Sequence, residues 1–196
     1  MKRILIIACI FGIGLILMSC AGMAAKPTEA NFKAPVVSLD SVLVPQYFGF
    51  WFYDAKITPV KGKAGANSSP LPVSFIFNIT NTNDYPIKLD GLLFTIAFDD
   101  IEVNMVNAFE TQWIPAGKTN QISVISIVDL AQLLGSLSVP NAEKVKAKNT
   151  NAWALLEKWW TEIPNMTVPI EVKKGAATFT ADGVQKVIPF AAKFPK

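Results

Sequence analysis

Histidine is absent from this 196-residue sequence. Its absence removes the commonest general base and the commonest metal ligand of proteins. It excludes Ser-His-Asp and Cys-His nucleophile systems and the zinc sites that use histidine. Chemistry based on carboxylates alone or on a Ser-Lys pair remains open, but no motif indicates it. A glycine-rich phosphate loop and metal-ligand spacings are missing as well. We therefore expect a protein that is not an enzyme and that needs no cofactor and no metal.

Cysteine is scarce, and both cysteines, Cys9 and Cys20, lie near the N-terminus. No disulfide can form within a domain built from the rest of the chain, so its stability must come from a hydrophobic core. The excess of basic over acidic residues is small too. Without residues 1–19, which hold Lys2 and Arg3, the 18 basic residues fall to 16 while the 15 acidic residues remain. This balance gives no electrostatic footprint for nucleic acid, and we expect no nucleic-acid partner.

Residues 1–19 have the form of a secretory signal peptide. Lys2 and Arg3 precede an apolar run of about 15 residues, shorter than the ~20 residues of a spanning helix. The run ends in Leu17-Met18-Ser19-Cys20, which resembles the lipobox of bacterial lipoproteins. The resemblance implies that Cys20 becomes the first mature residue and carries acyl chains, so the membrane is a partner through this anchor. The alternatives are an ordinary signal whose cysteine is coincidental and an uncleaved anchor.

The segment after the cysteine is small and polar, and we expect residues 20–34 to form a lipidated tether. Ala21 does not resemble the Asp of an inner-membrane retention signal. In a cell with two membranes we therefore expect the protein at the outer membrane, facing the periplasm.

Residues 35–196 are expected to form one mainly β domain. Alternating apolar residues predict half-buried strands, most clearly over residues 73–81 and 92–98. Seven or eight such segments, separated by turns, indicate an antiparallel β-sandwich. One irregularity follows Val124, where the apolar side changes to Ile125 and Ile127; this predicts a bulge or a strand buried on both faces.

Two helical segments interrupt the strand pattern. Asp129 is expected to cap a short helix that ends near Gly135. Asn151 is expected to cap a second helix that runs to about Trp160 and carries a wide apolar stripe. This second helix belongs to a predicted helical insertion at about residues 140–164.

A series of short motifs runs through the middle of the chain. They are Asn81-Thr82-Asn83, Pro86-Ile87, Leu89, Gly91-Leu92 and the turn Ile114-Pro115-Ala116-Gly117-Lys118. In this order they resemble the late embryogenesis abundant group 2 family, also called the WHy (water stress and hypersensitive response) domain. Thr82 replaces the usual Pro of that family. The resemblance implies an immunoglobulin- or fibronectin type III-like sandwich without enzymatic activity, associated with desiccation and stress tolerance. It implies backbone-shaping roles for the matched residues and supplies no catalytic residues.

Aromatic residues are concentrated in Tyr47–Tyr53 and in the second predicted helix. As a strand, Tyr47–Tyr53 is apolar on both faces, so one face packs on the core and the other needs a cover. One interpretation makes all of these residues core, with the helix as the cover. The other is a groove for an acyl chain or an apolar peptide, or an edge resting on the membrane interface. The candidate apolar binding surface comprises Phe48, Phe50, Trp51, Phe52, Trp153, Trp159 and Trp160.

An acidic cluster, Asp99, Asp100 and Glu102, has the oxygen ligands that calcium prefers. It lacks the ligand spacing of a dedicated calcium loop, so a solvated hairpin tip is the favoured interpretation.

Together these features predict a non-catalytic envelope lipoprotein that protects or binds proteins at the membrane. A partly apolar sandwich surface would hold exposed segments of damaged client proteins and slow their aggregation. Two alternatives stay open. A carrier or sensor for a lipid or apolar small molecule requires an enclosed cavity lined by the aromatic residues, and a subunit of an envelope assembly requires a contiguous exposed apolar patch.

Overall fold

The computed structural model describes residues 26–195, except 54–55, 57, 62 and 64–66. Cys20 and the signal peptide lie outside the described residues. The chain is mainly β, with 50% strand and 18% helix. Its strands are β1 (Val36–Leu43), β2 (Phe52–Tyr53), β3 (Pro59–Val60), β4 (Asn67–Ser68), β5 (Pro70–Thr80), β6 (Ile87–Phe98), β7 (Ile101–Ala108), β8 (Gln112–Ile114), β9 (Thr119–Asp129), β10 (Ile170–Ala181) and β11 (Val184–Phe194). Its helices are α2 (Leu130–Ser138), α3 (Ala142–Ala147), α4 (Ala152–Glu162) and the 3₁₀ turn η1 (Ile163–Asn165).

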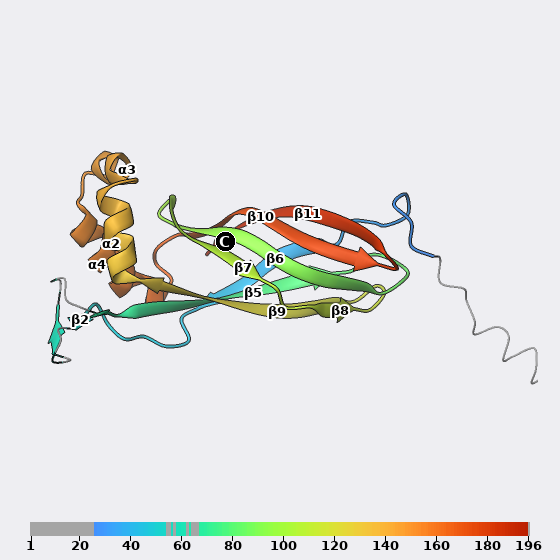
Figure 1. Ribbon diagram of the computed structural model, residues 1–196, viewed down its shortest axis with the longest axis horizontal. Helices are drawn as coiled ribbons and strands as arrows, with labels where there is room; N and C mark the ends of the chain where they lie inside the picture. The colour runs from blue at the N-terminus through green and yellow to red at the C-terminus, as the bar shows by residue number, and fades with distance from the viewer. Residues whose placement is uncertain (1–25, 54–55, 57, 62, 64–66, 196) are drawn as a thin grey trace, which may run out of the picture.

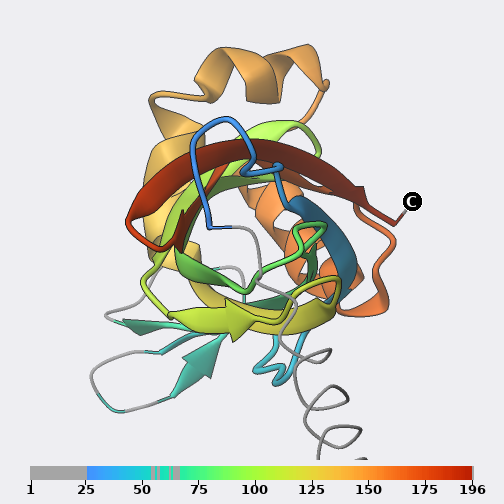
Figure 2. The same ribbon diagram turned by 90° about the vertical axis from the view of Figure 1, so that its right-hand side faces the viewer.

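Two antiparallel sheets form the β-sandwich that the strand pattern predicts. One sheet has the order β1-β5-β9, and the other has the order β11-β10-β6-β7 with β8 beside β6. A small third sheet, β3-β2-β4, lies near the helices at one end of the elongated molecule (Figure 1). Seen along the long axis, the two main sheets face each other as curved layers (Figure 2).

The core lies between the inner faces of these sheets. Phe75 and Phe77 of β5 meet Phe94 of β6 edge-to-face, with ring centroids 5.4 and 5.3 Å apart. Phe190 of β11 packs against Phe77 at 5.6 Å. Such pairs add to the stabilisation that burial alone provides. The alternation over residues 73–81 predicts correctly which side chains of β5 face the core. Those side chains, Val73, Phe75, Phe77 and Ile79, are fully buried.

Two hairpins close with two-residue turns in which both residues have positive φ. Asp99 and Asp100 join β6 to β7 with φ of 48° and 71°, and Asp182 and Gly183 join β10 to β11 with 44° and 83°. Positive φ at both central positions is the type I′ pattern that matches strand twist. The tight connection predicted at Asp99–Asp100 is confirmed.

Buried asparagines fix the loops at the end of the sandwich away from the helices. Asn81 is fully buried, and its Nδ2 donates to the carbonyl oxygens of Tyr85 (2.8 Å), Ile114 (3.1 Å) and Pro115 (3.1 Å). Its Oδ1 accepts from the backbone N–H of Asn83 at 2.9 Å. Asn81 therefore holds the β5–β6 loop against the β8–β9 turn.

The helices begin where their caps predict. The Asp129 carboxylate accepts from the backbone N–H groups of Ala131 and Gln132, and Asn151 Oδ1 accepts from that of Ala154 at 3.0 Å. The expected end of α2 near Gly135 is wrong, because the helix continues to Ser138 and buries Leu137 on the same face as Leu133. Among the described residues no helix is both long enough and apolar enough to cross a bilayer.

The end of the predicted tether is folded onto the sandwich. Phe32 is buried, and its carbonyl accepts from Lys186 Nζ at 2.6 Å. Asn83 forms two hydrogen bonds with the backbone of Lys33. Its Oδ1 accepts from the Lys33 N–H at 2.7 Å, and its Nδ2 donates to the Lys33 carbonyl at 3.0 Å. The domain therefore begins near Thr28 rather than at residue 35, because the apolar Phe32 side chain finds a buried site.

Candidate functional site

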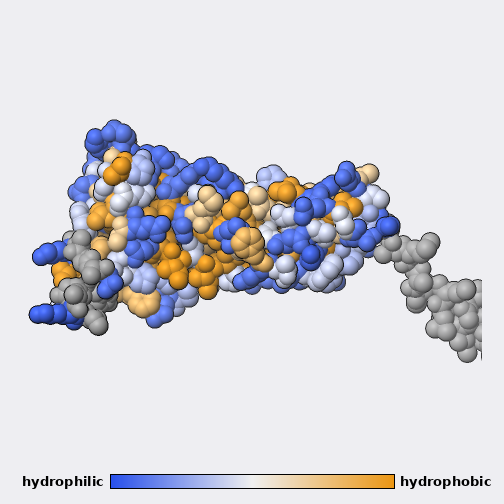
Figure 3. Space-filling view, viewed as in Figure 1, coloured by the Kyte–Doolittle hydropathy of each residue, from blue (hydrophilic) through white to orange (hydrophobic). Residues whose placement is uncertain are grey.

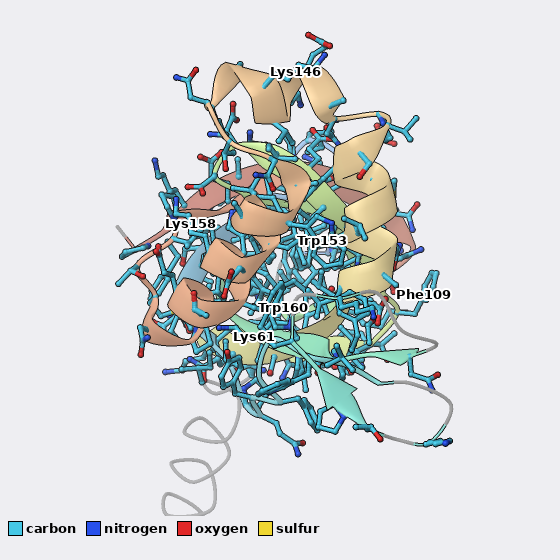
Figure 4. The ribbon with its side chains drawn as sticks, turned by 90° about the vertical axis from the view of Figure 1, so that its left-hand side faces the viewer. Lys61, Phe109, Lys146, Trp153, Lys158 and Trp160 are labelled. Atoms are coloured by element: carbon cyan, nitrogen blue, oxygen red, sulfur yellow. The ribbon has the colours of Figure 1, made fainter. Side chains whose placement is uncertain are left out.

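The seven candidate aromatic residues fall into two groups. Phe50, Phe52, Trp159 and Trp160 are buried in the core, Phe48 and Trp51 are exposed, and Trp153 is partly buried. Trp153 packs edge-to-face on Phe52 with ring centroids 5.6 Å apart, which joins α4 to β2. Figure 4 shows Trp153 and Trp160 enclosed at the helical end. Of the seven, only Phe48 and Trp51 are exposed, at 40% and 37%.

The expected strand over residues 47–53 is also shorter than predicted. Only Phe52–Tyr53 pairs, with β3 on one side and β4 on the other. Gly49 has a φ of 82°, which breaks the extended conformation before the strand starts.

The acidic hairpin tip is neutralised by lysines. Asp99 accepts from Lys158 Nζ at 2.8 Å and from Trp159 Nε1 at 3.0 Å, so the tip ties α4 to the sandwich. Burial alone would raise the pKa of Asp99, but these two hydrogen bonds outweigh it and hold the pKa below its usual range.

The other two carboxylates of the cluster are paired as well. Asp100 pairs with Lys173, and Glu102 lies 2.7 Å from Lys174 Nζ. The hydrogen bonds from these lysines lower the pKa of both carboxyl groups. Within the described part of the chain, no cluster of three or more acidic or cysteine side chains has a metal-binding arrangement. The predicted hairpin tip is confirmed, but it is not solvated throughout, because the Asp99 side chain is only 12% exposed where it contacts α4.

β9 departs most from its sequence-based interpretation. It pairs with β5 from Thr119 to Asp129 without a register shift, so the predicted bulge is wrong. Burial on both faces is wrong too, because Ile125 and Ile127 are 58% and 63% exposed. The buried partner between them is Ser126, whose hydroxyl accepts from Asn104 Nδ2 of β7 at 2.9 Å. This hydrogen bond satisfies a polar side chain on the inner face and leaves the two isoleucines in solvent.

Exposed apolar side chains gather along one edge of the sandwich. Met105 of β7 is 67% exposed and Phe109, just after β7, is 75% exposed. With Ile125 and Ile127 of β9 they form what we call the apolar edge. In the view of Figure 3, apolar residues gather over the middle of the molecule, where β6, β7 and β9 lie in Figure 1. Figure 4 shows Phe109 projecting away from the enclosed Trp153 and Trp160.

A hollow of about 350 Å³ lies within the apolar edge, between β9 and the segment after β7. Its lining residues are Val106, Asn107, Ala108, Phe109, Glu110, Ser123, Val124 and Ile125. Glu110 is the one ionisable residue of this lining, and it forms no ion pair with a described residue.

Two further hollows lie elsewhere on the surface. One of about 240 Å³ lies over Gly91 and shares Phe109 as a wall, and one of about 420 Å³ lies beside Asp99 and α4. None of the three hollows is lined by any of the seven candidate aromatic residues.

The sequence alone did not identify the apolar edge, because apolar residues in strands were expected to be buried in the core. The signal was present in the sequence, since Ile125 and Ile127 alternate with serines but stand out of phase with Ile122 and Val124. Read as one regular strand, that pattern places two isoleucines in solvent.

No family model matches this sequence, and no curated protein matches it. Among solved structures, a protein from Arabidopsis thaliana is similar at 14% identity and a TM-score of 0.48, covering 88% of this chain and 85% of its own. A protein from Archaeoglobus fulgidus is similar at 15% identity and a TM-score of 0.42, covering 80% of this chain and 94% of its own.

Proposed function

We propose that this protein is a non-catalytic envelope lipoprotein with a WHy-type domain that holds exposed apolar segments of other proteins. In this proposal Cys20 carries the lipid anchor, and the outer membrane is the site of residence. The apolar edge is the observation that carries the proposal. Four large apolar side chains, each more than half exposed along one edge, form the kind of surface that marks protein-binding sites.

The strength of such binding follows from the side chains involved. Burying one large apolar side chain contributes roughly 1.5–3 kcal/mol when it starts fully exposed. The four residues of the apolar edge start more than half exposed, so together they would contribute roughly 4–8 kcal/mol before the cost of association. Weak and reversible binding of this kind suits a protein that holds a damaged client and then releases it.

The stress-related part of the proposal rests on the sequence motifs. Asn81 and Asn83 shape loops in the way that the WHy resemblance implies, within a β-sandwich of the expected kind. The envelope part rests on the lipobox-like sequence that ends at Cys20.

An aggregation assay tests the proposal. A thermolabile client protein is heated with the acylated full chain, and light scattering is followed. We expect the wild type to suppress scattering and the double variant Phe109→Ser, Ile127→Ser to lose at least half of that suppression. Val187→Ser is the matched control, because Val187 is 59% exposed on β11 and lies outside the apolar edge.

Two results would contradict the proposal. One is a wild type that suppresses aggregation no better than an inert protein of equal mass. The other is an equal loss of suppression in the Val187→Ser control, since the effect would then not depend on the apolar edge.

A further inference from the structure

We infer that β9 takes up an extended segment of another polypeptide as an added strand, with one side chain of that segment seated in the hollow beside Val124. The inference rests on the proposed function and names its ligand class: an unfolded segment with alternating apolar residues and a basic residue near its anchor.

The first argument compares the edges of the two main sheets. Natural edge strands resist pairing with other chains through charges, prolines, bulges or short length. β11 carries Lys186, Pro189 and Lys193. β1 has a register shift at Asp40, β7 contains Glu102 and shifts register against β6, and β8 is three residues long.

β9 lacks nearly all of these features. It is 11 residues long, it pairs regularly with β5, and it contains no proline. Its one charged residue is Asp129 at the far end, where it caps α2. Among the edges of the two main sheets, β9 is therefore the one left open to strand pairing.

The backbone of β9 is available for such pairing. β9 ends its sheet, so half of its N–H and C=O groups face away from β5. On that side, Gln112 Nε2 donates to the Gln121 carbonyl at 3.4 Å. From Ser123 to Val128, the backbone forms no hydrogen bond with a described residue outside β5. This stretch offers room for a segment of about four to six residues at roughly 3.3 Å per residue.

The hollow provides side-chain recognition. Its lining includes the buried Val106 and Val124 and the exposed Phe109 and Ile125, and β9 contributes its middle residues 123–125. Side chains of an added strand alternate between the two faces of the sheet. One side chain would enter the hollow, and its neighbours would lie on the solvent-facing side, where the exposed residues Glu110 and Ile125 line the hollow. Main-chain bonds with a pocket for alternate side chains are the usual form of strand addition.

The same geometry argues against a second copy as the occupant. In a β9–β9 dimer, the inward residues of the partner strand would have to fill the hollow. Those residues, Ile122, Val124 and Val128, are each less than 7% exposed because they form the core of their own domain. An unfolded segment has free side chains for both faces, so it fits where a folded copy does not.

Charge defines the segment further. Glu110 is exposed in the lining of the hollow and lacks an ion pair with any described residue. A lysine or arginine next to the seated side chain would pair with it. We therefore expect segments such as Thr-Val-Lys-Leu-Thr-Val to bind better than otherwise equal segments with Glu in place of Lys.

Fluorescence polarisation with a labelled Thr-Val-Lys-Leu-Thr-Val peptide and the acylated full chain in detergent micelles tests the inference. The comparison peptide carries N-methyl groups on alternate residues, which removes the hydrogen-bond donors of one edge and keeps the side chains. A second comparison peptide has Glu for Lys. The protein variants are Ile125→Lys, which places a charge on the edge, and Val187→Lys as its matched control on β11.

We expect the unmodified peptide to bind, N-methylation and Ile125→Lys each to weaken binding at least tenfold, and Val187→Lys to leave it unchanged. Equal binding of the N-methylated peptide would overturn strand addition while leaving apolar-segment binding, and thus the proposed function, intact. Absence of peptide binding, together with a concentration-dependent dimer that Ile125→Lys dissociates, would assign the edge to a second copy and overturn the inference. If the protein neither binds the peptide nor dimerises, and the wild type does not suppress client aggregation, the proposed function is overturned as well.

Discussion

Single residues decide how the loops of this sandwich are held, and Asn81 is the clearest case. The two N–H groups of its side-chain amide are shared among three carbonyl oxygens from two separate segments, and it is fully buried. Removing it takes a donor from these carbonyls, of which Pro115 keeps the bond from the Lys118 N–H, and takes the acceptor from the Asn83 N–H. Each buried group left without a partner costs about 1–3 kcal/mol.

Asn81→Ala should therefore lower the free energy of unfolding by about 3 kcal/mol in total. Urea unfolding followed by circular dichroism measures this loss. Asn165→Ala is the control, because Asn165 is exposed and its side chain forms a single long bond of 3.4 Å. We expect that control to stay within about 0.5 kcal/mol of the wild type. A loss at Asn81 no larger than at Asn165 would show that the three bonds do not stabilise the fold.

Whether a single side chain is buried is the property that the sequence predicts least well. Sequence reasoning places Phe75 and Phe77 inside correctly, because hydrophobic alternation is regular there. It fails at Ser126, because an inward serine becomes acceptable only when Asn104 of another strand supplies a partner. That contact joins residues 22 positions apart, and no local pattern contains it.

At the scale of elements, α4 is joined to the sandwich by an aromatic contact and an ion pair. Trp159 packs on Phe98 with ring centroids 5.5 Å apart, and Asp99 binds both Lys158 and Trp159. The pKa of Asp99 is lower in the folded protein than in the unfolded chain. Its contribution to stability is therefore complete above the unfolded pKa of about 4 and disappears as the pH falls through the folded value.

Asp99→Asn should destabilise the protein at pH 7 by about 1–2 kcal/mol, and the difference from the wild type should shrink as the pH falls from 5 to 3. Asparagine tolerates the positive φ of this position, so the turn itself is preserved. Urea unfolding at several pH values measures the difference. Asp182→Asn, in the equivalent turn of β10–β11, removes an exposed pair with Lys26 and should change little. A difference that does not vary with pH would contradict the assigned role of the carboxylate.

Elements with strong local signals could be predicted from sequence. The hairpin at Asp99–Asp100 and the capped starts of α2 and α4 follow from turn and cap residues. The end of α2 could not be predicted, because Leu137 gains a buried position in the tertiary fold that outweighs Gly135. The apolar edge of the candidate site follows from the phase of β9, which a correct strand register would have indicated.

At the scale of the whole molecule, the described chain begins at the end opposite the helices (Figure 1). If Cys20 holds the anchor, five residues lie between it and Lys26, and the six Cα–Cα steps span at most about 22 Å. In the proposed arrangement the helices point away from the membrane. In that arrangement the apolar edge would lie along the side of the molecule, where the proposed client would approach parallel to the membrane surface.

The anchor itself is tested by metabolic labelling with palmitate. Cys20→Ser should abolish incorporation of the label and release the protein from the membrane fraction. Cys9→Ser, within the predicted signal peptide, should retain both properties. Continued labelling of the Cys20→Ser variant would contradict acylation at this residue.

The contacts that fasten residues 28–33 also determine how the domain responds to pulling. Tension transmitted from a membrane anchor would reach Phe32, Lys186 and Asn83 before it reaches β1. Beyond them, β1 lies antiparallel to β5, so a force along the strand would shear several hydrogen bonds together rather than open them one by one. Resistance to such a force depends on the rate of unfolding rather than on its equilibrium. If the proposed anchor on Cys20 is present, these contacts and the pairing of β1 with β5 would slow unfolding of the domain under such a force.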